Sequence, residues 1–140
     1  MAAYNLTPYP LSMVICDACH RDPGTGKFFL LGLFSAISAP SFPFSHSQLV
    51  VYTSVTDGLG IVDLKLQFVE VSNDDEVLVE LSQEANFDDP RMVAEAVYIF
   101  QGLPIPRPGE YRFKLFANNE FLIERRVLVN AIKNEELSHE

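Results

Sequence analysis

The sequence lacks the long apolar run that a membrane-spanning helix needs, since no uninterrupted hydrophobic stretch reaches about 18 residues. Its first ten residues contain no Lys or Arg and are interrupted by Pro8 and Pro10. The charged start and apolar middle of a signal peptide are therefore missing as well. Together these absences predict a soluble, cytoplasmic protein that does not associate with a membrane.

Basic residues are scarce, with ten Lys and Arg against nineteen Asp and Glu and a net charge of −9. A protein that binds the phosphate backbone needs the opposite sign, so we expect no nucleic-acid partner. Half of the basic residues nevertheless fall between positions 107 and 126. We call Arg112, Lys114 and Arg126 the basic strip. It is a candidate docking surface for an acidic protein partner, although solvated strand faces that balance nearby carboxylates are the alternative interpretation.

Catalytic signatures are also missing: there is no G-x-S-x-G, H-E-x-x-H or Walker sequence. The segment from Asp57 to Gly60 is too short and too poor in glycine to form a phosphate-binding loop. We therefore expect a protein that is not an enzyme, with no catalytic residue, no cofactor and no metal.

The sharpest chemical motif is C-x-x-C-H at residues 16–20, which is the attachment signature of c-type haem. Two other interpretations are a zinc site, in which His20, His46 and His139 are the histidines that could supplement the cysteines, and thiol catalysis by Cys16 or Cys19 with His20. The motif falls at the end of an expected strand, where Cys16 and Cys19 would lie about 10 Å apart on opposite faces. That geometry favours a structural interpretation, in which a buried cysteine packs as a small hydrophobic residue.

Acidic turns offer an alternative function, the binding of calcium or a small ligand, because calcium-binding sandwiches gather carboxylates from loops at one end. The residues concerned are Asp57, Asp74, Asp75, Asp88 and Asp89. Aspartate is also a common residue of the turns between β-strands.

What the chain does contain is hydrophobic residues at 48%, including 11 Phe, which indicates one folded domain with a substantial core. Period-two alternation between turn signals predicts an all-β fold, an immunoglobulin-like antiparallel β-sandwich of about eight strands over residues 11–130. Residues 1–10 would form an N-terminal arm and residues 131–140 an acidic tail. The first six strands are expected at 11–19, 27–37, 48–55, 60–71, 76–83 and 92–103, with a helix as the rival at 92–103.

The pattern of residues 107–129 predicts a hairpin of the last two strands, and the length of its loop decides the register of their pairing. A two-residue loop, Asn118-Asn119, would oppose Arg112 to Arg125, whereas a three-residue loop opposes Lys114 to Glu124. Because opposed like charges cost about as much as a good cross-strand pair contributes, roughly 0.2–1 kcal/mol, we predict the three-residue loop, with a bulge at Asn119. This register leaves Arg125 on the core face, either swung out by a bulge or half-buried against a carboxylate.

Two further features of the sequence concern aromatic residues. Tyr111 follows Pro108-Gly109 and opens a strand, as the tyrosine corner of immunoglobulin-like sandwiches does, which is a structural role. Phe42 and Phe44 lie beside Pro40 and Pro43 in an expected loop, 38–47. They form either an exposed contact site or a loop that caps one end of the core.

Three segments, MVICDACHRDPGTGK, LLGLFSAI and RPGEYRFKLFANNEFLIERRVLV, together resemble an uncharacterised bacterial family of small β-sandwich proteins. This is a domain of unknown function frequent in planctomycete-type genomes, and the resemblance covers roughly residues 11–130. An aliphatic residue is usual in that family where Cys19 stands, which implies that the C-x-x-C-H match is accidental. The resemblance implies no activity and no site residues.

The sequence thus predicts a non-catalytic binding or adaptor module that acts through protein contacts or self-association. Its candidate partner-binding residues are Arg112, Lys114, Arg126, Phe42 and Phe44.

Overall fold

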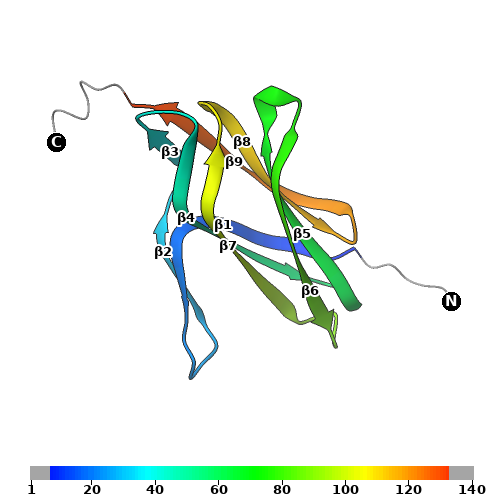
Figure 1. The fold of residues 1–140 in the computed structure, drawn as a ribbon. Helices are drawn as coiled ribbons and strands as arrows, with labels where there is room; N and C mark the ends of the chain where they lie inside the picture. The colour runs from blue at the N-terminus through cyan, green and yellow to red at the C-terminus, as the bar shows by residue number, and fades with distance from the viewer. Residues whose placement is uncertain (1–6, 133–140) are drawn as a thin grey trace.

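The computed structural model describes residues 7–132, and within them the chain forms nine β-strands and one turn of 3-10 helix. Figure 1 shows the strands running through two layers. The strands are β1 (Tyr9–Arg21), β2 (Phe28–Leu33), β3 (Ala36–Ala39), β4 (Phe44–Thr56), β5 (Gly60–Glu70), β6 (Glu76–Phe87), β7 (Val93–Ile105), β8 (Gly109–Ala117) and β9 (Glu120–Ala131), with the 3-10 turn η1 at Val71–Asn73. The described part of the chain contains no helix long and apolar enough to cross a membrane.

The strands form a four-stranded sheet in the order β2-β1-β4-β7 and a five-stranded sheet in the order β3-β9-β8-β5-β6. β3 runs parallel to β9, and the other paired strands are antiparallel. One hydrophobic core lies between the sheets, and residues of both contribute to it. Successive side chains of a strand point to opposite faces, which explains the alternation in the sequence: Val62 and Leu64 of β5 are buried in the core, while Asp63 between them is exposed.

The expected strand at 27–37 is wrong as a single element, because the chain changes sheets within it. β2 ends at Leu33 beside β1, and β3 begins at Ala36 beside β9. Gly32, with φ of 73°, adopts a left-handed backbone conformation just before the crossing. The run is apolar on both sides of this break, so hydrophobicity alone did not reveal where the sheet changes.

The loop expected at 38–47 is correspondingly shorter. β3 extends to Ala39, and β4 already begins at Phe44, four residues before the predicted start of that strand. Pro40 and Pro43 both lie in the short connection between β3 and β4, where no ladder bond is required of them. The segment expected at 92–103 is strand β7, so the rival helix is wrong.

The final hairpin has the predicted register but a different loop. Lys114 lies opposite Glu124 and Leu115 opposite Ile123, as expected. Ala117 pairs with Glu120, however, so the loop is the two-residue Asn118-Asn119, and both asparagines have positive φ. The register shift falls between Leu115 and Phe116 instead of at Asn119. The extra residue therefore lies inside the strand pair, and like charges still meet at Arg112 and Arg126.

The predicted arm and tail lie mostly outside the described residues. Within the expected arm, the structure describes Thr7 to Pro10 and places Tyr9 and Pro10 in β1. At the other end β9 runs through Ala131, the first residue of the predicted tail. Residues 1–6 and 133–140 are outside the described part of the chain.

Candidate functional site

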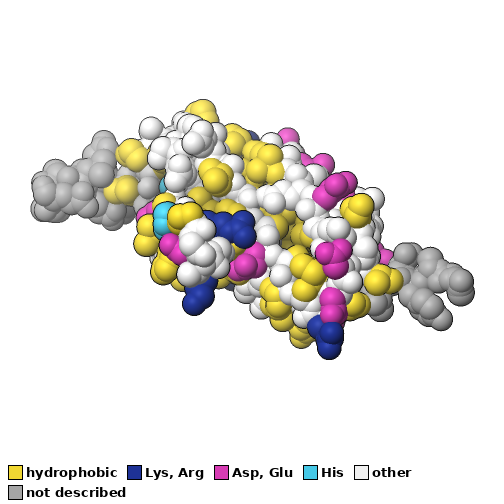
Figure 2. All heavy atoms as spheres, turned by 90° about the horizontal axis from the view of Figure 1, so that it is seen from below, with side chains coloured by type: hydrophobic (Ala, Val, Ile, Leu, Met, Phe, Trp, Pro, Cys, Tyr) yellow, Lys and Arg dark blue, Asp and Glu magenta, His cyan; other side chains and the backbone are white. Residues whose placement is uncertain are grey.

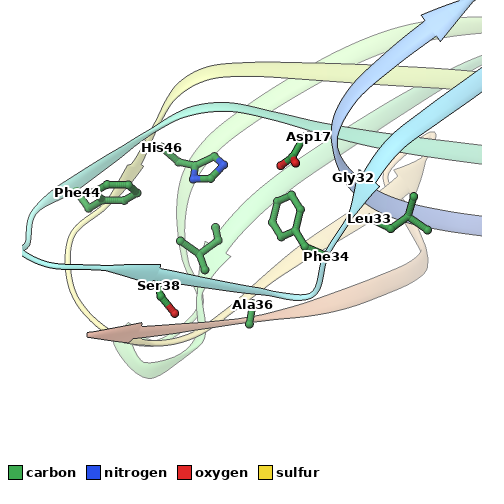
Figure 3. A pocket seen from close by; sticks show the side chains of 9 residues that line it. Asp17, Gly32, Leu33, Phe34, Ala36, Ser38, Phe44 and His46 are labelled. Atoms are coloured by element: carbon green, nitrogen blue, oxygen red, sulfur yellow. The ribbon is translucent and has the colours of Figure 1, made fainter. Parts of the chain in front are cut away.

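A pocket of about 300 Å³ opens where the chain leaves one sheet for the other. Its wall combines a carboxylate, aromatic rings and an imidazole, as Figure 3 shows. Its lining includes Asp17, Gly32, Phe34, Ile37, Phe44 and His46. We call this hollow the Asp17 pocket. It draws side chains from β1, β4 and the β2–β3 segment, so the sheet change that the sequence did not reveal is what creates it.

Asp17 and Gly32 approach each other closely across β1 and β2. A Cβ atom added to Gly32 would lie 2.4 Å from Oδ2 of Asp17, closer than two unbonded atoms can come. The carboxylate therefore occupies the space that any other side chain at position 32 would need. This agrees with the close approach that a glycine inside a strand indicates.

Three rings lie together in the Asp17 pocket. The centroid of the His46 ring is 5.9 Å from that of Phe34 and 6.1 Å from that of Phe44, at interplanar angles of 41° and 64°. All three side chains are half-buried. Because aromatic pairs at these separations attract each other through their quadrupoles, the rings hold one another in place along the wall.

Phe42 and Phe44, the predicted contact residues, are both half-buried and pack against the core. This is the arrangement that the capping alternative describes. Phe44 also lines the Asp17 pocket, while Phe42 does not appear in its wall.

The basic strip lies on the outer face of the five-stranded sheet and is matched by carboxylates. Arg112 forms ion pairs of 2.8 Å with both Glu110 and Glu124. Arg126 lies 3.5 Å from the same Glu110, and Lys114 lies 3.9 Å from Asp75. Exposed pairs of this kind contribute little free energy each, but they leave the strip without a strong net positive charge. This is the arrangement that the alternative interpretation, charge balance on a solvated face, describes.

Arg125 is half-buried, which is one of the two arrangements expected for it. Its Nη1 donates a hydrogen bond of 3.0 Å to the backbone carbonyl of Met13 in the opposite sheet. The partner is thus a carbonyl, and the expected carboxylate is wrong. The guanidinium joins the two sheets at their rim while its methylene stem packs.

The two cysteines are free. Cys16 is fully buried and its Sγ donates to the carbonyl of Ala18, whereas Cys19 is half-buried. Burial raises the pKa of both thiols, which keeps them protonated and weakly nucleophilic near neutral pH.

Among residues 7–132 no three His, Cys, Asp or Glu side chains are grouped so that they could hold a metal ion. The acidic turns that suggested calcium therefore do not form a ligand cluster there. His139, the third histidine considered for zinc, lies outside the described residues.

Sequence reasoning missed two features that the structure brings forward. Glu70 is fully buried, with its Oε2 3.3 Å from Nη1 of Arg107. The alternation along β5 could have revealed it, since Glu70 follows Leu64, Leu66 and Phe68 on the inward face. The Asp17 pocket, in contrast, joins positions up to 29 residues apart (17 to 46) and has no local signal.

The outer face of the four-stranded sheet differs from that of the other sheet, because apolar residues cross it in rows. Leu33 pairs with Cys16, Cys16 with Val50, and Val50 with Ile99, so that one row spans all four strands. We call these four residues the apolar row. Its inner members are buried, whereas Leu33 and Ile99 at its ends are 65% and 56% exposed.

The neighbouring rows on this face are nearly uncharged. Val14, Tyr52 and Val97 form the next row, and Ser12, Ser54 and Glu95 the one after it. Glu95 is the carboxylate of these rows, and it accepts a hydrogen bond from the Tyr52 hydroxyl. Figure 2 shows a different side, the molecule from below, where the β1–β2 and β6–β7 connections lie in Figure 1 and hydrophobic side chains are exposed between scattered acidic and basic groups.

Comparison with known proteins assigns the chain to a family whose function is unknown. No curated protein matches the chain. A family model matches residues 11–130, and its description is a family of unknown function, DUF6941. That range agrees with the one over which the sequence resembles an uncharacterised family. The chain therefore belongs to the DUF6941 family.

Proposed function

We propose that the protein is an immunoglobulin-like β-sandwich that acts in the cytoplasm as a non-catalytic binding module. Support for the fold comes from connectivity. β4–β7 and β5–β8 reproduce the B–E and C–F pairs of that fold, with β8–β9 as its F–G hairpin. Tyr111 gives further support, because it has the hydrogen bonds of a tyrosine corner. Its hydroxyl donates to the carbonyl of Arg107 and accepts from the N–H of the same residue.

We further propose that the module works by self-association through the outer face of the four-stranded sheet. The observation that carries this is the contrast between the two outer faces. One presents ion-paired charges around Arg112, and the other presents the apolar row with two exposed ends. Leu31, on the same face of β2 as Leu33, is 55% exposed, and adjoining exposed apolar residues are a mark of an interaction site. This interface therefore replaces the basic strip as the leading candidate.

A second copy of the chain is the occupant that fits this face best. Each copy carries a net charge of −9, which would oppose association through a charged surface. The rows across β1, β4 and β7 contain one carboxylate, so two such faces meet with little like-charge repulsion. An acidic or a basic partner would find few groups there with which to pair.

The face is also large enough. β1, β4 and β7 each contain 13 residues. At ~3.3 Å per residue and ~4.8 Å between strands, they give a flat footprint of about 600 Å². Side chains roughen this surface, which brings its accessible area close to the ~800 Å² per partner of a standard interface.

Sedimentation equilibrium of the purified chain over a range of concentrations tests the proposal. We expect a reversible dimer for the native chain and a monomer for the double variant Leu33→Glu/Ile99→Glu. Ile61→Glu is the matched control, because Ile61 is 67% exposed on β5 of the other sheet; it should remain dimeric. A native chain that is monomeric throughout, or a control that dissociates as the double variant does, would refute self-association through this face.

A further inference from the structure

We propose that the Asp17 pocket binds a small organic cation, an amine or a quaternary ammonium group. The pocket shares Phe44 with the predicted contact residues and Leu33 with the apolar row, but the proposal does not depend on self-association. It rests on three properties of the pocket: an uncompensated carboxylate, a wall of rings, and a volume suited to a small ligand.

The carboxylate of Asp17 supplies the negative pole. Among the described residues it takes part in no ion pair and accepts no hydrogen bond; the bond to this residue, from Gln48, ends on its backbone carbonyl. Glu110 and Asp89 have arginine partners, whereas the Asp17 side chain, which is exposed, has none among the described residues. Gly32 keeps the carboxylate against the backbone at the pocket wall. A cation entering the pocket therefore meets a charge that no protein group has neutralised.

The rings supply the second element of recognition. The face of an aromatic ring attracts a cation within about 6 Å of its centroid. Phe34 and Phe44 flank His46 at 5.9 and 6.1 Å, and Figure 3 shows Phe34 and His46 bordering the same hollow as Asp17. An alkylammonium group placed there contacts rings on one side and the carboxylate on the other.

Size and polarity narrow the ligand further. A volume of about 300 Å³ lies at the lower end of small-molecule sites. Ile37, which is 5% exposed, gives the pocket an apolar wall. This combination suits a compact cation with apolar substituents.

Other ligand classes fit less well. Bare metal ions need more ligands than one carboxylate and one imidazole, since zinc takes four and calcium six to eight. Anions would be repelled by Asp17 and by the net charge of −9. A neutral apolar molecule would remove water from the carboxylate without offering it a partner.

Isothermal titration with choline and its neutral isostere 3,3-dimethylbutan-1-ol tests the proposal directly. The two molecules share shape and hydroxyl and differ in charge, so choline should bind about tenfold more tightly. Equal affinities would overturn the proposal, as would the absence of choline binding up to about 50 mM. In two-dimensional amide NMR spectra, the resonances of Asp17, Phe34 and His46 should shift with choline and saturate.

Variants then test whether the carboxylate of Asp17 is the group that attracts the cation. Asp17→Asn preserves shape and should weaken choline binding about tenfold, while Phe34→Leu should weaken it severalfold. Asp88→Asn, which removes one exposed carboxylate from the β6–β7 connection, is the matched control and should bind as the native chain does. Equal weakening by Asp17→Asn and Asp88→Asn would show a general charge effect and overturn the site. Unchanged thermal melting confirms that each variant is folded.

An alkylammonium group can come from a free metabolite or from a lysine side chain of another protein. A parallel titration with Nα-acetyl-lysine methylamide distinguishes the sources, since this compound presents a charged side-chain amine on a peptide backbone. Tighter binding of choline would assign the pocket to small molecules, and tighter binding of the lysine derivative would assign it to a protein side chain.

Discussion

Tyr111 shows how one side chain secures a connection between the two sheets. Its ring is fully buried and stacks on Phe68 with 5.2 Å between centroids, while its hydroxyl bonds both backbone groups of Arg107. The hydroxyl thereby fixes the chain just before β8 begins. This role could be predicted from sequence, because a tyrosine directly after a Pro-Gly turn at the start of a strand is itself the signal.

Tyr111→Phe should lower the free energy of unfolding by about 1–3 kcal/mol, because two hydrogen bonds are lost and the ring is retained. Urea denaturation followed by circular dichroism measures the change. Tyr9→Phe is the control, since Tyr9 is 61% exposed, and it should leave the midpoint unchanged. If Tyr111→Phe is as stable as the native chain, the hydroxyl does not secure this connection.

The cysteines give a second test at the scale of single residues. Cys16 is fully buried and Cys19 is half-buried, and burial raises the pKa of both thiols. We therefore expect a thiol reagent at pH 8 to label one cysteine slowly in the native protein and two in denaturant. Cys19→Ser should abolish the native reaction and Cys16→Ser should preserve it. Rapid labelling of both thiols without denaturant would contradict this account.

Among the elements, the final hairpin was the best predicted and also the most instructive. The prediction that Lys114 lies opposite Glu124 gave the right register. Cross-strand pairs of opposite charge are stabilising and pairs of like charge are not, so the charges along the two strands favour one register. The predicted loop length was wrong, because a bulge inside the strand pair changes the register by one residue just as an extra loop residue would. Sequence patterns do not distinguish these two solutions.

Asn118 and Asn119 should respond differently to substitution. Asn118 has φ of 47°, and its Oδ1 accepts a hydrogen bond from the N–H of Asp63. Asn118→Ala loses that bond and strains the backbone, so it should cost about 1–3 kcal/mol. Asn119→Gly removes a bond from Lys65 but relaxes a φ of 69°, and should change stability little. Equal losses in thermal melting would contradict this division.

β2 and β3 illustrate what a sequence pattern leaves open. Both are apolar, and the connection of two residues between them, Phe34-Ser35, carries no Pro, Asn or Asp to mark a turn. A glycine inside the expected strand 27–37 indicates a bulge or a close approach, yet the residue that approaches Gly32, Asp17, lies 15 residues earlier. The Asp17 pocket depends on this crossing, so the strands were largely predictable and the candidate site was not.

For the molecule as a whole, buried tyrosines predict how stability depends on pH. Burial, together with a hydrogen bond to Glu95, raises the pKa of Tyr52 to about 12, and burial raises the pKa of Tyr98 and Tyr111. These hydroxyls ionise more easily in the unfolded chain, near pH 10. Their contribution to stability is therefore complete below pH 10 and is lost as the pH rises toward 12 and above.

We expect the free energy of unfolding to fall steeply between about pH 10 and pH 12. Urea titrations at several pH values measure the slope, and Tyr52→Phe should make it shallower, because one linked proton is removed. Tyr9→Phe serves as the control and should leave the slope unchanged. A Tyr52→Phe variant with the native slope would show that Tyr52 ionises alike in both states.

At the same scale, the chain presents two unlike outer faces, and the sequence indicated this only in part. Both faces of β1 carry apolar residues, which indicates a strand that is covered on each side or that pairs with another chain. The apolar row became visible only when pairing placed Leu33, Cys16, Val50 and Ile99 in line. These residues come from four strands, and their alignment depends on tertiary structure.

Self-association through this face is the central claim, and methyl NMR of the unmodified chain tests it most directly. In a dilution series, the methyl resonances of Leu33 and Ile99 should shift with concentration along one binding curve. The methyl resonances of Ile61, on the other sheet, should not move. Resonances of Leu33 and Ile99 that stay fixed over the whole series, or that move no more than those of Ile61, would contradict the claim.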